Sequence, residues 1–213
     1  MRLGSYYRSI VAPYLGVAPT GSLVLDVGAA DGALLERFPQ VRGVALDPSP
    51  NRSGNATFIK GDGIYAPFAS GTFDTVFAFD VLEHVRQDDL LMRELLRLTR
   101  PGGTLWVSVP SRELSVFPAF VTGFLHRRWG HVRPGYRWEE VMGLLPLLVE
   151  VTVYEWNEPT YRLAYIALKL LSLVAPGLAR RALRTVARLD SDARPGRQGH
   201  LFFRIRVSAA GME

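Results

Sequence analysis

The residues of this chain that could do chemistry begin at a glycine-rich turn between an apolar run and a helix-like segment. The apolar run Leu23–Val27 contains Asp26, and the turn after it carries Gly28, Asp31 and Gly32. Glycines remove the Cβ atoms that would keep a ligand away from the backbone. The pattern predicts the first strand of an α/β sheet, opening onto a helix N-terminus that can receive a ligand.

The spacing of this turn argues against a dinucleotide. A dinucleotide fingerprint has glycine at three positions, and this chain has alanine at two of them, Ala30 and Ala33, so a pyrophosphate fits poorly. Asp26 at the strand end and Asp31 inside the turn suit a cationic or amine-bearing ligand better. The turn therefore favours S-adenosylmethionine (SAM), which carries both a sulfonium and an amino group.

Three later strands end in groups that fit the same ligand. Asp47 follows the second strand, about 20 residues beyond the first glycine, where an acidic side chain can accept both hydroxyls of a ribose. Asp62, between two glycines after the third strand, could accept from an adenine amino group, and Asp80 ends the fourth strand. Each Asp alone is also a common helix N-cap. Ligands of open parallel sheets bind beyond the carboxyl ends of the strands, so the four groups together indicate one site.

Alternating short strands and helices must position these groups. Apolar runs predict strands at residues 23–27, 43–47, 57–60, 75–79, 104–109, 149–156 and 200–207. Helical spacing predicts helices at residues 6–15, 33–38, 88–99 and 137–148. This alternation implies a parallel sheet with right-handed crossovers.

Composition fits one globular domain. The chain has 213 residues, of which 48% are hydrophobic and 21% charged. We expect a single domain over residues 1–213, with a ligand-binding core at 20–110 and insertions at 111–136 and 158–199 that form a substrate lid. The absence of cysteine excludes disulfides and thiolate chemistry, and residues 1–15 lack the long apolar core of a signal peptide. We therefore expect a cytoplasmic protein.

The chain resembles class I SAM-dependent methyltransferases with the type 11 methyltransferase domain, the group similar to ubiquinone and menaquinone methyltransferases. The resemblance lies in LVLDVGAADGALL, VALDPSP, KGDGIYAPFASGTFDTVFAFDVLEHV and LTRPGGTLWVSVP. It implies an α/β fold with a Rossmann-like, seven-stranded, mostly parallel sheet, helices on both faces, an antiparallel last strand and helical insertions. It also implies SAM as the methyl donor and S-adenosylhomocysteine as its product.

By this resemblance, the SAM site is formed by strand ends and the turns that follow them. Its expected residues are Asp26, Gly28, Ala30, Gly32, Asp47, Asp62, Gly63 and Asp80. The glycine-rich turn would pack against the methionine part, Asp47 would bind the ribose, and Asp62 with the Gly63 backbone would bind adenine. Asp80 would lie beside the sulfonium. Many relatives have glycine in place of Ala30, where a methyl group should narrow the turn only slightly.

Methyl transfer requires an aligned acceptor and, for a hydroxyl acceptor, removal of a proton. His131 is the predicted general base, because its insertion should cover the acceptor site; the alternative is a histidine that braces a loop. His84, just after the fourth strand, is a second candidate with an equally plausible structural role. Tyr136 is the third predicted residue of the acceptor site.

No metal is expected. Asp80, Glu83 and His84 could present oxygen and imidazole ligands on one side of a turn, a spacing similar to that in a related group of RNA 3′-end methyltransferases that use a divalent metal. However, Leu-Glu-His-Val is frequent in metal-free members of the family, and no additional histidine cluster follows it.

The second insertion carries a different signal. Residues 163–174 are almost continuously apolar but fall short of the ~20 residues needed to cross a bilayer. Beyond a Pro-Gly break, arginines gather near one helical face, at Arg180, Arg181, Arg184 and Arg188. This pattern predicts peripheral contact of residues 163–188 with the inner membrane face. A helical lid or a dimer contact with solvated arginines is the alternative.

Together these patterns predict a SAM-dependent methyltransferase for a small-molecule, saccharide or lipid-linked acceptor, with O-methylation favoured. The net charge of +5 rests almost wholly on arginine, which would suit a nucleic-acid (RNA) methyltransferase or binder. No recognised nucleic-acid-binding module is present, so this remains the alternative. A non-catalytic scaffold with a SAM-binding fold is the other.

Overall fold

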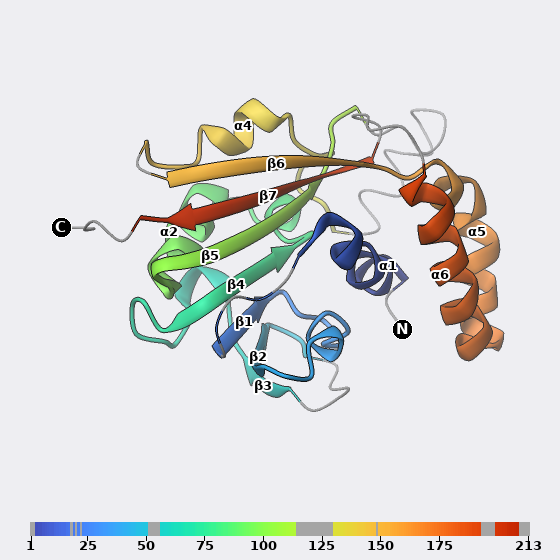
Figure 1. Cartoon of the computed structure of the whole chain (residues 1–213), viewed down its shortest axis with the longest axis horizontal. Coiled ribbons are helices and arrows are strands. Elements are labelled where there is room, and N and C mark those ends of the chain that lie inside the picture. Colours follow the sequence, from blue (N-terminus) through green and yellow to red (C-terminus); the bar gives the residue numbers. More distant parts are fainter. Residues whose placement is uncertain are drawn as a thin grey trace.

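The computed structural model describes residues 3–17, 19, 21, 23–50, 56–113, 130–147, 149–192 and 199–208. They contain a seven-stranded sheet with the spatial order β3-β2-β1-β4-β5-β7-β6 (Figure 1). The strands are β1 (Leu23–Val27), β2 (Arg42–Asp47), β3 (Thr57–Lys60), β4 (Phe73–Phe79), β5 (Thr99–Pro110), β6 (Val149–Asn157) and β7 (Gly199–Val207).

The strand directions match the expected class I arrangement. Strands β1 to β5 pair in parallel, whereas β7 runs antiparallel to both β5 and β6. The predicted seven-stranded sheet with an antiparallel last strand is therefore confirmed. In this register His200 lies opposite Pro110, so β7 begins at the edge where the parallel strands end.

Helices cover both faces of the sheet. On one face, Leu25, Val76 and Phe203 belong to a core that also includes buried residues of α2 (Asp88–Leu98) and α4 (Trp138–Met142). On the opposite face, Val24 and Phe77 belong to a second core, in which they pack against the segment after β1. Alternate residues of each strand face the two cores, as the period-2 geometry of a strand requires.

The second face is completed by three helices that come from the two ends of the chain. They are α1 (Leu3–Val11), α5 (Pro159–Val174) and α6 (Pro176–Ser191), and their buried residues share a core with Phe202 of β7. In Figure 1 these helices lie together beside the edge at which β4 ends. Within the described residues, no helix is long and apolar enough to span a membrane.

Two predicted helices are wrong in extent. Over residues 33–38 only Leu35–Arg37 forms, as a single 3₁₀ turn, because Pro39 disfavours helical geometry at Phe38 and the Gly32 turn leaves no room for a longer helix. Over residues 137–148 only α4 forms, and Gly143 and Pro146 follow its last turn. The first predicted helix is α1 followed by a 3₁₀ turn at Ala12–Leu15.

Candidate active site

The strand ends that carry the predicted ligand groups meet at one edge of the sheet. Asp26 in β1 pairs in register with Ala45 in β2 and Phe77 in β4. Asp47 is the last residue of β2, and Asp80 directly follows β4. The fold therefore brings these three carboxyl groups to the same edge.

The glycine-rich turn has the backbone geometry that its sequence suggested. Gly28 has φ +72 and its N–H donates to the Leu46 carbonyl at 2.8 Å; a Cβ built there would lie 2.5 Å from Val81 Cγ2. Gly32 also has a positive φ, of +77. Ala30 adopts φ +52, which costs a non-glycine residue about 1–2 kcal/mol. The turn thus holds left-handed residues at 28, 30 and 32, and a larger residue at 28 would displace Val81.

Asp47 holds this turn in place. Its Oδ2 accepts a hydrogen bond from the Ala30 N–H at 2.9 Å, and its Oδ1 accepts one from the Ser49 N–H at 2.7 Å. The side chain is buried. Because a carboxylate offers about four lone-pair sites, the two oxygens retain capacity to accept two ribose hydroxyls.

Asp62 serves as a cap in this structure. It precedes the 3₁₀ turn Gly63–Tyr65, and its carboxylate accepts a hydrogen bond from the Ile64 N–H at 3.0 Å. A Cβ at Gly63 would lie 2.8 Å from Val27 Cγ1, so the backbone packs closely against the end of β1. The adenine-binding role of Asp62 and Gly63 stays a prediction.

Asp26 lines a small pocket at the centre of the edge. Burial raises the pKa of its carboxyl well above the usual range, and the nearby charges of Asp47 and Asp31 raise it further. Arg8, Gly28 and others complete the pocket, whose volume is about 20 Å³, room for about one water molecule.

Asp80 is held in an unusual backbone conformation. Its φ is +53, and Ser108 Oγ donates to its Oδ1 at 2.9 Å. Arg8 Nε donates to its Oδ2 at 3.1 Å. Burial acts to raise the pKa of Asp80, but the charge of Arg8 outweighs it and holds the pKa below its ordinary value.

Arg8 joins Asp80 to two more buried groups that the sequence did not indicate. Arg8 Nη1 donates to Glu158 Oε2 at 2.8 Å, and Arg8 Nη2 lies 2.6 Å from His200 Nε2. A guanidinium can only donate, so Nε2 of His200 must accept, which places the imidazole proton on Nδ1, 3.2 Å from Glu158 Oε1. Although burial opposes it, Arg8 and His200 lower the pKa of Glu158.

We call Arg8, Asp80, Glu158 and His200 the buried ionic cluster. With His200 neutral, one cation and two carboxylates leave it with one net negative charge beside the pocket. The cluster joins α1, the end of β4, the start of α5 and the start of β7. No local pattern could have revealed it, since its members lie up to 192 residues apart in the chain.

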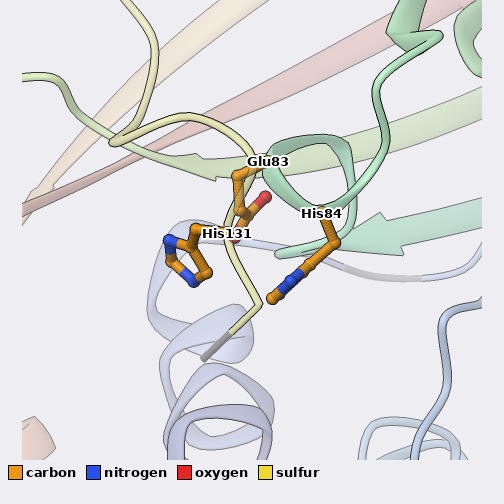
Figure 2. A group of neighbouring side chains, drawn as sticks. All are labelled: Glu83, His84 and His131. Atoms are coloured by element: carbon orange, nitrogen blue, oxygen red, sulfur yellow. The ribbon is translucent and has the colours of Figure 1, made fainter. Parts of the chain in front are cut away.

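The two candidate histidines come together against Glu83. The rings of His84 and His131 meet edge to face with centroids 4.6 Å apart. Glu83 is buried, and in Figure 2 its side chain lies above the two imidazoles. Burial, and then the charge of Asp80, raises the pKa of Glu83 well above the usual range. The sequence did not anticipate that His131 would join the Glu83–His84 pair.

This histidine group lies close to the buried ionic cluster. Glu83 and His84 belong to the 3₁₀ turn Leu82–His84, which follows β4 and Asp80. The backbone N–H of Val132 donates to the Glu83 carbonyl at 2.8 Å, which fixes the 130–136 segment over the turn after β4. That His131 lies at the acceptor site and that it acts as a base both stay predictions.

Tyr136 lies deeper than an acceptor contact would. Its side chain is buried, and its hydroxyl donates to Asp88 Oδ2 at 2.9 Å, with the Leu82 carbonyl at 3.1 Å. Burial and the hydrogen bond to Asp88 raise its pKa. Its predicted part in catalysis stays a prediction. The rest of the first insertion, residues 114–129, and residues 193–198 of the second lie outside the described residues.

The residues at this edge fit SAM. Gly28 allows the backbone to approach a ligand, Asp47 retains lone pairs for the ribose hydroxyls, and the net negative charge of the buried ionic cluster suits a sulfonium or an ammonium. A larger cavity of about 190 Å³ lies beside Ser111 and Arg137, but none of the strand-end groups lines it.

Comparisons with known proteins find a methyltransferase domain over part of the chain. Residues 25–107 match a family described as a methyltransferase domain. The chain is 33% identical over 104 residues to an uncharacterized methyltransferase of Mycobacterium leprae, an alignment that covers 44% of this chain and 39% of the relative. The chain thus spans about two fifths of the length of that relative.

Solved structures share the fold over nearly the whole chain. One is phosphoethanolamine N-methyltransferase 2 of Haemonchus contortus in complex with SAM, with TM-score 0.62 and 18% identity, covering 95% of this chain and 52% of that one. Another is the [4+2]-cyclase SpnF, with TM-score 0.57 and 20% identity, covering 96% of this chain and 82% of that one. Residues 25–107 thus match a methyltransferase domain, on a seven-stranded fold that the chain shares with a SAM-bound methyltransferase.

Proposed function

We propose that the protein transfers the methyl group of SAM to a hydroxyl oxygen of a small-molecule, saccharide or lipid-linked acceptor. The observation that carries this proposal is the position of His131 against Glu83 and His84, on the turn that follows the end of β4. An imidazole there can take the proton that a hydroxyl must lose. An amine acceptor that is already neutral would not need such a base.

His131 accepts the hydroxyl proton as the acceptor oxygen forms its bond to the methyl carbon. The carbon–sulfur bond of SAM breaks at the same time, and its electron pair stays on sulfur to give S-adenosylhomocysteine. Alignment of the oxygen, the carbon and the sulfur contributes most of the rate, and a general base typically adds roughly 10²–10⁴-fold.

The test is to incubate the pure protein with methyl-labelled SAM and fractionated cell extract, and to identify the labelled product. We expect a labelled ether or ester, and we expect His131→Ala to lower turnover by about 100-fold or more. The affinity of that variant for S-adenosylhomocysteine should stay within about 3-fold, because His131 acts on the acceptor rather than on the donor.

Other products would overturn the proposal. Label on nitrogen or carbon would exclude O-methylation, and label in RNA would support the nucleic-acid alternative. SAM binding without label in any fraction would support a non-catalytic scaffold, a use that the fold permits because fold alone does not determine activity.

A lipid-linked acceptor is favoured by the outer surface of α5 and α6. The large apolar side chains exposed there are Leu163, Ile166, Leu170, Leu173, Val174, Leu178 and Leu189. Those of α5 recur at the three- and four-residue spacing of one helix face, opposite buried Tyr161 and Leu168. In Figure 1 this helix pair forms the margin of the molecule, with α1 between it and the sheet.

The charge of the same helices suggests what they bind. Their basic residues are Arg162, Lys169, Arg180, Arg181, Arg184 and Arg188. Among the described acids of α5, α6 and their flanking residues, Glu158 and Asp190 are buried and Asp192 is exposed. An apolar face flanked by cations complements an anionic bilayer surface, to which each basic residue near it adds about 1 kcal/mol. We propose that residues 163–188 dock on anionic membranes.

Sedimentation with vesicles tests the docking. We expect binding to phosphatidylglycerol vesicles, little binding to phosphatidylcholine vesicles, and a loss of about 10-fold or more in the Leu170→Glu/Leu173→Glu variant, because the apolar face would then carry charge. Leu147→Glu is the matched control, since Leu147 is fully exposed elsewhere. Equal binding by both variants, or a dimer in solution that only the α5 variant disrupts, would contradict a membrane surface.

A further inference from the structure

The group formed by Glu83, His84 and His131 has features that methyl transfer from SAM does not require. One carboxylate oxygen and one nitrogen from each imidazole lie within 4.8 Å of one another (Figure 2). Glu83 is 1% exposed, and its Oε2 has no hydrogen-bond partner. A buried carboxylate oxygen without a partner is costly unless a cation or a donor meets it.

We propose that Glu83, His84 and His131 bind a divalent transition-metal ion. Two imidazoles and one carboxylate are the ligand set of catalytic zinc sites with an open position and of non-haem iron sites. Magnesium and calcium prefer oxygen ligands, so this set selects against them.

The protonation of His84 is already that of a ligand. Its Nδ1 lies 3.2 Å from the Gly130 carbonyl. A carbonyl can only accept, so Nδ1 carries the proton and Nε2 keeps its lone pair. A carbonyl that accepts from the other ring N–H in this way is typical of histidines bound to metals.

The possible ligand atoms of Glu83, His84 and His131 need to move only slightly closer together to bind one ion. Zinc bonds of about 2.0–2.2 Å in tetrahedral geometry bring ligand atoms to roughly 3.4 Å from one another, against the 4.8 Å limit observed here. The Val132 N–H bond to the Glu83 carbonyl ties the two segments together, while the exposed side chain of His84 has room to rotate. Side-chain rotation can therefore close the site without moving the sheet.

Three protein ligands leave a coordination position open toward the acceptor side. When bound, the ion would hold the acceptor oxygen and lower the pKa of its hydroxyl, so that the proton passes to water; the base role of His131 in the proposed function then applies to the metal-free protein. Metal binding itself does not depend on the proposed function; only this use of the ion rests on it.

Metal binding is tested directly on the full chain. We expect purified protein to bind Zn²⁺ in titration calorimetry with one site, and Co²⁺ with visible absorption bands typical of nitrogen and oxygen ligands. Glu83→Gln and His131→Ala should each weaken Zn²⁺ binding by about 10-fold or more. Glu139→Gln, an exposed acid on α4, is the matched control and should bind Zn²⁺ like the wild type.

Two results would overturn the metal site. One is the absence of a stoichiometric Zn²⁺ site at micromolar metal; the other is a site that Glu83→Gln and His131→Ala leave unchanged while thermal unfolding shows both variants folded. Methyl transfer that persists in a chelator, with no metal bound, would exclude the metal and leave the proposed function. Stoichiometric Zn²⁺ binding without methyl transfer to any acceptor would support the metal site and contradict the proposed function.

Discussion

Replacing Asp47 with alanine should weaken binding of S-adenosylhomocysteine by about 100-fold or more, a loss of at least about 2.7 kcal/mol. The variant loses the acceptor for the ribose hydroxyls, and hydrogen bonds to a charged group contribute about 1.5–3 kcal/mol each. It also leaves the Ala30 and Ser49 N–H groups without the carboxylate that holds the glycine-rich turn. Titration calorimetry with S-adenosylhomocysteine measures the loss.

Two variants make the result specific to Asp47. Asp47→Asn keeps one acceptor oxygen but not the charge, so its affinity should fall between those of the wild type and Asp47→Ala. Asp62→Ala removes an exposed carboxylate from the adenine side and should cost about 10-fold or less, since exposed hydrogen bonds contribute about 0.5–1.5 kcal/mol. Wild-type affinity in a folded Asp47→Ala protein would refute the ribose assignment.

The donor side of the site was predictable because its signals are local. Each carboxylate ends a short apolar strand, and a parallel sheet brings such ends together without any knowledge of side-chain packing. The glycines at 28 and 32 were recognisable for the same reason, since a left-handed turn favours that residue type. The left-handed Ala30 shows the limit of this logic, because Asp47 holds a residue there that propensity alone disfavours.

The buried ionic cluster and the histidine group were only partly predictable because their members meet through tertiary packing. Arg8 sits in the first helix and His200 in the last strand, and neither has a neighbour in sequence that marks it as part of a site. His131 was identified from its insertion, but its contact with His84 depends on how the 130–136 segment folds back over β4. The helices predicted at 33–38 and 137–148 were too long for a local reason, because prolines end them early.

Replacing Arg8 with methionine should destabilise the protein by about 3–5 kcal/mol at pH 7, because it removes the cation from two buried carboxylates. Arg8 contacts Asp80 and Glu158 at 3.1 and 2.8 Å, and Glu158 has almost no solvent exposure. At roughly 2–4 °C per kcal/mol for a chain of this size, the melting temperature should fall by about 10 °C. Calorimetric unfolding measures the change.

The matched control and a rescue separate this effect from general damage. Arg93→Met removes an exposed ion pair with Asp89 and should cost less than about 1 kcal/mol. In the double variant Arg8→Met/Glu158→Gln, the amide carries no charge that needs a partner, so we expect it to recover more than half of the loss. Equal melting temperatures for Arg8→Met and the wild type at pH 7 would refute the role of the cluster.

The free energy of unfolding should depend on pH with opposite signs in the wild type and in Arg8→Met. In the wild type, Asp80 and Glu158 have folded-state pKa values below their ordinary ones, so their stabilisation is present at neutral pH and is lost as the pH falls through those lowered values. Without Arg8, burial dominates at Glu158 and raises its pKa, so the variant loses stability as the pH rises above the ordinary carboxyl range. The difference in unfolding free energy should therefore be small at about pH 4 and large at pH 7, on either side of the carboxyl titration. An equal difference at both pH values would mean that Arg8 stabilises the fold by packing, and that the negative charge beside the SAM pocket is not set by this cluster.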